Sequence, residues 1–249
     1  MYQFFVEPEQ IHISDKTVII SGPDLNHMKN VLRMKPGEEF NVSNGIDGKE
    51  YRCAVRTYES DCALCELRFI KEDNVELGAE IYLFQGLPKA DKMELIIQKA
   101  VELGAYSIIP VETKRCVVKL DPKKVEAKTK RWQEIAKAAA KQSKRGIIPK
   151  VEQPVSFANA LEMAGQMEVK CIPYEMAEGM DKTRQMVESV KPGQRVAVFI
   201  GPEGGFEETE IQKAMDAGVE PITLGRRILR TETAGLTILS WFMYQLEKE

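Results

Sequence analysis

The spacing of hydrophobic and polar residues changes character near residue 73. Before that point, apolar and polar residues alternate in short segments, which are separated by turns such as Pro36-Gly37 and Asn44-Gly45. A period of two is typical of strands that bury one face. Strands are therefore expected over 3–6, 17–20, 39–43, 51–56 and 62–69, with one amphipathic helix over 24–33. The pattern predicts a small antiparallel β-barrel over residues 1–72.

After residue 73, short apolar runs alternate with segments of helical periodicity. Strands are expected over 81–84, 107–111, 169–172, 195–200 and 221–224, and helices over about 91–103, 122–144, 156–165, 182–190, 207–217 and 234–246. This order predicts an α/β domain over 73–249, with a mostly parallel sheet and helices on both faces. The last helix is apolar around most of its circumference, so it must be buried either in a monomer core or against a second subunit.

Composition narrows the class of protein. Hydrophobic residues make up 43% of the 249 residues, and no run has the length of a membrane span or the form of a secretory signal. Five cysteines without a disulfide-like framework are typical of a reducing compartment, so a cytoplasmic location is expected. Cys62 and Cys65 lie in a predicted strand without a second pair, and no metal is expected.

The net charge of −3 hides a strong asymmetry along the chain. Residues 114–150 contain 13 Lys or Arg and three acidic residues, which gives this segment a charge of +10 on an acidic remainder. A surplus of this size is what neutralising RNA phosphates requires, although lysine-rich helices are also often solvated faces. RNA contact is the favoured interpretation of this segment.

Two glycine-containing turns near the C-terminus each follow an apolar strand and precede a helix. The first is Gly201-Pro-Glu-Gly-Gly-Phe206 and the second is Leu224-Gly225. Neither has the lysine of a phosphate loop or the spacing of a dinucleotide fingerprint, so a nucleotide-phosphate enzyme is poorly supported. Adjacent glycines let main-chain amides approach a ligand, and Arg226, Arg227 and Arg230 suit an anion or a polar base edge. The simpler alternatives are a tight strand-to-helix turn and a solvated basic loop.

These motifs and others along the whole chain resemble the RsmE-type branch of the SPOUT methyltransferases. The first motif is Ile200–Phe206, and the second combines Leu224-Gly225 with Ile228-Leu-Arg-Thr-Glu-Thr-Ala234. The other matching motifs are Phe4-Phe5, His27–Arg33 followed by Gly37, Lys89 with Asp91-Lys-Met-Glu94, Gln98-Lys99, Glu102-Leu-Gly104, Arg115, Trp132 and Gln142-Ser-Lys-Arg145 before Pro149. Cys116 departs from the serine that is commoner in the family, which leaves only the fine geometry beside Arg115 in doubt.

The resemblance implies a fold and an activity. The fold is an N-terminal PUA-like β-barrel followed by a SPOUT domain whose C-terminal segments form a trefoil knot. The activity is S-adenosyl-L-methionine-dependent methylation of N3 of a uridine in the decoding region of 16S (small-subunit) ribosomal RNA. It implies a homodimer that acts on the assembled subunit. The alternative is a noncatalytic rRNA-binding or ribosome-assembly protein that keeps the fold.

The resemblance also implies roles for individual residues. Cofactor contacts are expected in three loops, from Pro173, Tyr174, Glu175, Gly201, Glu203, Gly204, Gly205, Leu224, Gly225, Ile228, Leu229, Arg230, Thr231, Thr233 and Ala234. Arg230 is expected to stabilise negative charge on the uracil oxygens. Glu203 or Glu232 is expected either to accept the N3 proton or simply to cap a helix. RNA contacts are expected from Arg33, Lys89, Lys92, Gln98, Glu102, Arg115, Gln142 and Arg145, with Lys35, Lys137 and Lys141 as further candidates.

Overall fold

A computed structural model describes residues 1–72, 75–177 and 179–247 of the chain. It divides into two compact units. The N-terminal unit contains Met1–Glu76 and Ala140–Ile148, and the C-terminal unit contains Leu77–Ala139 and Pro149–Glu249. The boundary expected near residue 73 falls at residues 73–74, which lie outside the described residues.

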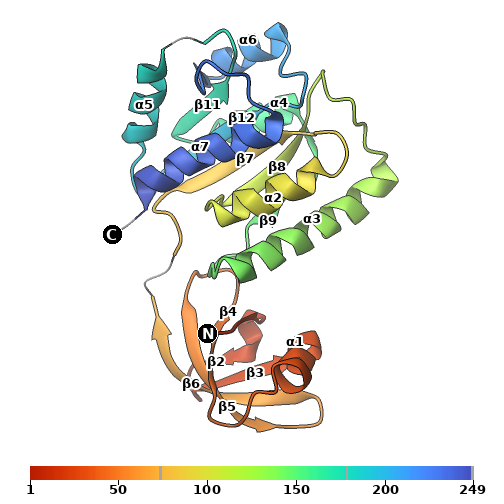
Figure 1. Ribbon diagram of the computed structural model, residues 1–249, viewed down its shortest axis with the longest axis vertical. Helices are drawn as coiled ribbons and strands as arrows, with labels where there is room; N and C mark the ends of the chain where they lie inside the picture. The colour runs from red at the N-terminus through yellow and green to blue at the C-terminus, as the bar shows by residue number, and fades with distance from the viewer. Residues whose placement is uncertain (73–74, 178, 248–249) are drawn as a thin grey trace. The chain divides into compact units, whose positions relative to one another are not determined.

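The N-terminal unit is built on one six-stranded sheet in the order β1-β4-β5-β6-β3-β2 (Figure 1). The strands are β1 (Gln3–Phe5), β2 (Ile11–His12), β3 (Thr17–Ser21), β4 (Glu39–Ser43), β5 (Glu50–Tyr58) and β6 (Cys62–Lys71). Neighbours are antiparallel except β1 and β4, which are parallel. Alternate residues of these strands, including Val18, Ile20 and Phe40, are fully buried, as the period of two predicts.

The helical part of this unit is less regular than the sequence predicts. The 3₁₀ turn η1 (Pro8–Gln10) precedes β2, and the expected helix over 24–33 is a short α1 (Gly22–Asn26) that continues as the π-helix η2 (His27–Val31). Met28 is its fully buried residue. Arg33 lies beyond the helix with φ of 54°, a left-handed conformation that ends the helical run.

Residues 140–148 pack within the N-terminal unit although they lie far along the chain. The Ile148 amide donates to the Gly45 carbonyl at 2.9 Å, and the Gln3 side-chain amide donates to the Arg145 carbonyl at 2.9 Å. A Cβ on Gly146 would lie 2.4 Å from the Gly48 carbonyl oxygen, so only glycine fits there. Sequence reasoning placed this segment in the second domain because local patterns carry no information on such long-range pairing.

The C-terminal unit contains a seven-stranded, wholly parallel sheet in the order β10-β8-β7-β12-β11-β13, with β9 beside β8. The strands are β7 (Glu80–Gly86), β8 (Ser107–Glu112), β9 (Lys150–Val151), β10 (Val155–Ser156), β11 (Val169–Pro173), β12 (Arg195–Ile200) and β13 (Glu220–Ile222). The helices are α2 (Lys92–Glu102), α3 (Pro122–Gln142), α4 (Phe157–Ala164), α5 (Met180–Ser189), α6 (Glu208–Asp216) and α7 (Thr231–Leu246). The parallel sheet is therefore confirmed.

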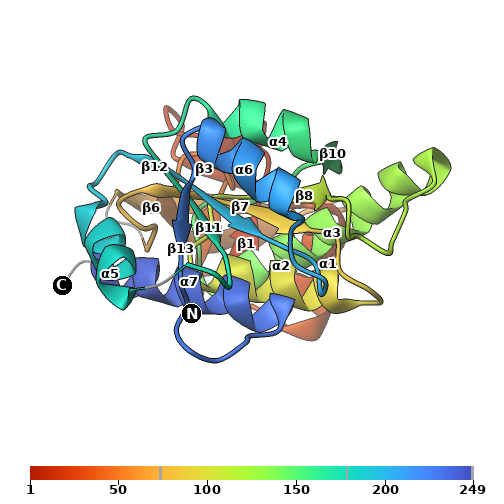
Figure 2. The same ribbon diagram turned by 90° about the horizontal axis from the view of Figure 1, so that it is seen from above.

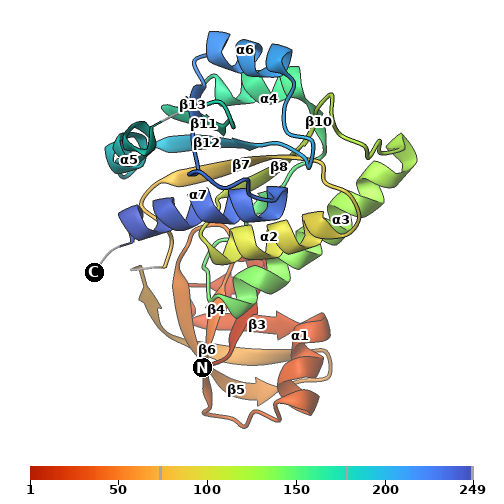
Figure 3. The same cartoon turned by 45° about the horizontal axis from the view of Figure 1, so that its top comes forward.

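Helices cover both faces of this sheet. Figures 2 and 3 show α4 and α6 on one face and α2 and α7 on the other. Between the layers, most residues of the central strands β7 and β12 are buried, and Phe84 stacks on Phe199 with ring centroids 4.6 Å apart. Among the described residues, no helix has the length and hydrophobicity to span a membrane.

Candidate active site

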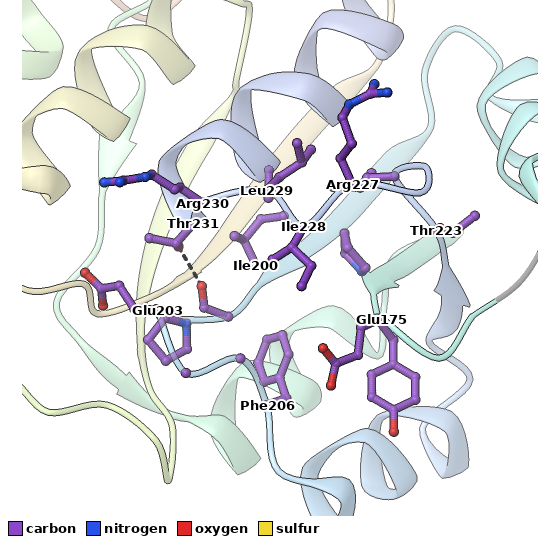
Figure 4. Close-up of a pocket in the computed structure, with 18 of the residues that line it drawn as sticks. Glu175, Ile200, Glu203, Phe206, Thr223, Arg227, Ile228, Leu229, Arg230 and Thr231 are labelled. Carbon is purple, nitrogen blue, oxygen red and sulfur yellow. Dashed lines mark hydrogen bonds between the residues drawn. The ribbon is translucent and has the colours of Figure 1, made fainter.

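A cavity of about 530 Å³ opens at the carboxyl end of the parallel sheet. Its walls are the loop after β11, the loop after β12 and the segment between β13 and α7, as Figure 4 shows. Every residue that was expected to contact the cofactor lines it except Thr233, which is exposed. The cavity thus brings together residues from three loops, which lie between Pro173 and Ala234, 61 positions apart along the chain.

Hydrogen bonds fix these segments against one another. The Tyr174 amide donates to the Ile222 carbonyl at 2.9 Å, which ties the loop after β11 to β13. Thr231 donates its hydroxyl to the Gly201 carbonyl at 2.6 Å (Figure 4). The same hydroxyl accepts a hydrogen bond from the buried Gln85 side-chain amide at 2.9 Å. From β13 at the sheet edge, the chain therefore returns past β11 to begin α7 beside the end of β12. The trefoil knot itself stays a prediction of the resemblance.

Main-chain groups of the glycine turns face the cavity. Gly205 has φ of 66° and Gly225 has φ of 107°, which are backbone conformations that residues with a Cβ rarely adopt. Arg115 donates to the Gly204 carbonyl at 2.9 Å, and a Cβ on Gly204 would lie 3.3 Å from the Arg115 Cβ. Arg115, expected to contact RNA, is therefore part of the cavity wall.

The middle of the cavity is apolar and its ends are charged. Figure 4 shows Ile200, Phe206 and Ile228 around the centre, with Glu175 at one end and Glu203 and Arg230 at the other. Ile228 lines the cavity although 92% of its surface is exposed. This arrangement suits a ligand with a flat apolar part and charged groups.

One end of the cavity holds a cluster of alternating charge. Lys92 at the start of α2 lies 3.0 Å from a Glu203 oxygen and 3.3 Å from a Glu232 oxygen. Burial raises the pKa of Glu203, but hydrogen bonds from main-chain amides and from Lys92 outweigh it, so the net pKa is lowered. Glu203 is therefore ionised at neutral pH and already has donors on its carboxylate.

The arginines of this region differ in how they are held. The side chains of Arg226, Arg227 and Arg230 are exposed, and they make no hydrogen bond or ion pair with any residue that the structure describes. Figure 4 shows Arg227 directed away from the cavity, whereas Arg230 lies on the side of Glu203. Arg230 is also the N-cap residue of α7, although its side chain makes no capping bond. Its guanidinium is thus free to meet a ligand.

Comparisons with known proteins identify the family. Residues 75–243 match the model of an RNA methyltransferase domain, and residues 20–57 match that of an RNA methyltransferase PUA domain. Ribosomal RNA small subunit methyltransferase E of Bacillus subtilis (strain 168) is 37% identical over 251 residues, which cover 99% of this chain and 98% of the relative. The chain belongs to the ribosomal RNA small subunit methyltransferase E family.

Solved structures agree with this assignment. A ribosomal RNA small subunit methyltransferase E from Neisseria gonorrhoeae, bound to S-adenosyl methionine, matches with a TM-score of 0.80 and 31% identity, covering 96% of this chain and 95% of that one. The methyltransferase Lpg2936 from Legionella pneumophila, in complex with the cofactor SAM, matches with a TM-score of 0.76 and 33% identity, covering 92% and 91%. The SPOUT α/β fold and the PUA-like N-terminal domain are therefore confirmed.

The residues expected to contact RNA are dispersed. Exposed members are Arg33 in the N-terminal unit, Lys89 before α2, Gln98 on α2 and Gln142 at the end of α3, whereas Lys92 and Arg115 line the cavity and Glu102 pairs with Lys99. Arg145 is the exception to the expectation, because only 4% of its side chain is exposed and its guanidinium forms an ion pair with Glu76. Arg145 is a structural residue of the N-terminal unit, so a surface contact with RNA is wrong for this side chain.

Sequence reasoning missed several residues of the site. Gln85 is the clearest case: it is fully buried, it holds Thr231, and its own Oε1 has no hydrogen-bond partner among the described residues. A polar residue that ends an apolar strand just before a glycine is the signal that could have found it. Thr183 on α5 was also missed, and its hydroxyl donates to the carbonyl of the cavity residue Thr223 at 2.9 Å.

Proposed function

We propose that this chain transfers a methyl group from S-adenosyl-L-methionine to N3 of a uridine in the decoding region of 16S ribosomal RNA, on the assembled small subunit. The observation that carries the proposal is the cavity, since it is formed by the glycine loops in which the resemblance expected the cofactor. Family membership supports RNA as the substrate class.

The cavity fits S-adenosyl-L-methionine by size and by chemistry. Its volume of about 530 Å³ lies within the range of small-molecule sites. Ile200 and Phe206 offer apolar walls for a flat base, and the glycine turns offer main-chain donors and acceptors. Glu175 makes no hydrogen bond or ion pair with another described residue, so its carboxylate is available to a cationic group of the ligand.

The reaction asks little of the protein beyond placement and charge. The cofactor supplies an electrophilic methyl group on its sulfonium, and the protein must align uridine N3 with that methyl. Loss of the N3 proton places negative charge on the uracil oxygens, and Arg230 is proposed to stabilise it. Glu203 and Glu232 remain the candidates for the proton acceptor, although Glu203 is the poorer base because its pKa is lowered.

The basic segment is proposed to bind the RNA backbone. Along α3 the side chains of Lys123, Lys124, Lys128, Lys130 and Lys137 are all exposed. Phosphate contacts of this kind position a substrate without reading its sequence, and they weaken as salt rises. Arg33 is proposed as a contact from the PUA-like domain.

A homodimer in the cytoplasm is part of the proposal. A shallow groove of about 260 Å³ lies between α5 and α7, lined by Val187, Trp241 and Tyr244 among others. Tyr244 is 87% exposed, which is unusual for an aromatic residue on a helix this apolar. A second copy that packs against this face would bury it and would explain why α7 is apolar around most of its circumference.

Methyl transfer to small ribosomal subunits tests the proposal directly. Subunits from cells that lack the gene are incubated with labelled S-adenosyl-L-methionine, and their nucleosides are analysed by mass spectrometry. The expected product is N3-methyluridine at one site in 16S rRNA. Cofactor binding without incorporation would indicate another RNA, and absence of cofactor binding by calorimetry would favour a noncatalytic rRNA-binding or ribosome-assembly protein.

A further inference from the structure

Three charged side chains from distant parts of the chain meet at one end of the cavity. Lys92 comes from the first turn of α2, Glu203 from the loop after β12, and Glu232 from the first turn of α7. The Lys92 ammonium lies 3.0 Å from Glu203 Oε1 and 3.3 Å from Glu232 Oε2. The two carboxylates thus hold the ammonium between them by ion pairs, and the contact with Glu232 Oε2 lacks hydrogen-bond geometry.

Beyond these two carboxylates, the Lys92 ammonium has no partner in the described part of the chain. Lys92 lines the cavity, while its two carboxylate partners hold the ammonium in place. The carboxylate of Glu203, with a smaller contribution from that of Glu232, raises the pKa of Lys92 above its usual value, so the cation persists in alkaline solution. The site therefore presents a permanent, oriented N–H donor to whatever occupies this end of the cavity.

The other nearby cations are less well fixed. Arg230 lies at the same end of the cavity, but its side chain is exposed and makes no ion pair within the described residues. A donor that is already oriented stabilises developing charge more than one that must first be ordered, because no reorganisation accompanies the reaction. By this criterion Lys92 is better suited than Arg230 to meet a developing anion.

We propose that Lys92 is a catalytic residue whose free N–H donates to a uracil oxygen as N3 loses its proton. The inference rests on the proposed function. In the reaction the N3–H bond breaks and the proton passes, directly or through water, to one of the two candidate carboxylates, Glu203 or Glu232. The electron pair of that bond stays delocalised over N3 and the uracil oxygens. That pair then forms the new N3–methyl bond as the bond between carbon and sulfur breaks, and the sulfur keeps the electrons of that bond. No covalent bond of Lys92 forms or breaks. The hydrogen bond from its ammonium lowers the energy of the uracil anion.

Two neutral variants and one charged variant test the role of Lys92. Lys92→Met removes the ammonium, Lys92→Gln keeps a neutral donor that can still bond the two carboxylates, and Lys92→Arg keeps the charge. Lys213→Met, at an exposed position on α6 outside the cavity, is the charge-matched control. Calorimetry with S-adenosyl-L-methionine and thermal melting establish for each protein that the cavity is intact.

The kcat for methyl transfer to small ribosomal subunits is then measured as a function of pH. In both neutral variants kcat is expected to fall by about 100-fold or more, the usual effect of removing one fixed donor to an anion, with cofactor affinity changed less than threefold. The rising limb of the kcat–pH profile should move to higher pH, because without the cation the N3 proton is harder to remove. Lys92→Arg should recover part of kcat and move the limb back, and Lys213→Met should match the wild-type protein.

Several results would overturn this assignment. Wild-type kcat with an unmoved pH limb in either neutral variant removes Lys92 from the chemistry. Loss of cofactor binding or of folding in both neutral variants makes Lys92 a binding or structural residue instead. Each of these results leaves N3-methyluridine formation by the wild-type protein intact, whereas absence of that product from the wild-type reaction refutes the proposed function itself.

Discussion

Thr231 is expected to join the end of β12 to the start of α7, and its replacement by valine tests that junction. The change keeps the shape of the side chain but removes a donor to the Gly201 carbonyl at 2.6 Å and an acceptor for the Gln85 amide at 2.9 Å. Gln85 is fully buried and retains only its bond to the Gly86 carbonyl. The loss of these two hydrogen bonds, together with the buried polar groups that it leaves partly unsatisfied, should lower the free energy of unfolding by about 2–4 kcal/mol.

Denaturant unfolding followed by tryptophan fluorescence measures this effect. Both tryptophans of the chain, Trp132 and Trp241, lie in the C-terminal unit, so the signal reports that unit alone. Thr237→Val is the matched control, because it makes the same change on the same helix where the hydroxyl bonds only to the Thr233 carbonyl of that helix. The control should cost less than about 0.5 kcal/mol.

The junction also predicts a binding effect. Thr231 lines the cavity, and its bond to Gly201 holds the glycine loop against α7. Thr231→Val should therefore weaken S-adenosyl-L-methionine binding in calorimetry, while Thr237→Val leaves the affinity unchanged. Equal stability of the two variants, or a loss of stability in Thr231→Val below about 0.5 kcal/mol, would refute the reasoning about the junction.

Three other changes probe the fold. Gly86→Ala would place a Cβ 2.6 Å from a Pro202 side-chain carbon, so it should displace the glycine loop and lower the melting temperature and the cofactor affinity together. Glu76→Gln weakens the charged hydrogen bonds between this side chain and the buried Arg145 guanidinium and should cost the N-terminal unit about 1.5–3 kcal/mol, seen as faster amide exchange in β3–β6 with an unchanged tryptophan transition. Hydrogen bonds from Arg195, the first residue of β12, lower the pKa of Glu168 from 4.5 to about 2. Because that pKa is depressed in the folded state, its stabilisation is complete above about pH 4.5 and disappears as the pH falls through 2; Glu168→Gln should match the wild-type denaturant midpoint only at that acid extreme.

The arrangement of strands and helices could be predicted because it rests on local periodicity. The apolar runs at 81–84 and 195–200 correspond to β7 and β12, which lie side by side as parallel strands. Periodicity failed where a segment is short or strained. The two-residue strand β9 has no pattern to detect, and the expected helix over 24–33 contains a π-helical stretch that ends at Val31.

Residue type alone does not report the distant partners of a polar side chain, as Arg145 and Thr231 show. Arg145 belongs to a basic segment and was expected at an RNA surface, yet its guanidinium lies inside the N-terminal unit against Glu76. Thr231 begins α7, where Arg230 holds the N-cap position, and the Thr231 hydroxyl bonds across to the Gly201 carbonyl. Both side chains are fixed by partners that lie 30 or more residues away.

The site also shows why the glycine motifs were easier to find than the side chains that complete them. In a parallel sheet every strand delivers its carboxyl end to the same edge, so the segment after β7 must lie beside the loop after the adjacent β12. Gln85, near the end of β7, belongs to no motif and holds Thr231, whereas Lys92 follows in the motif Asp91–Glu94 and pairs with Glu203 and Glu232. Strand order therefore decides which polar residues at the ends of the central strands lie close together. The end of β7 therefore supports the cavity indirectly, because Gln85 holds the cavity residue Thr231 although no described residue of β7 lines the cavity itself.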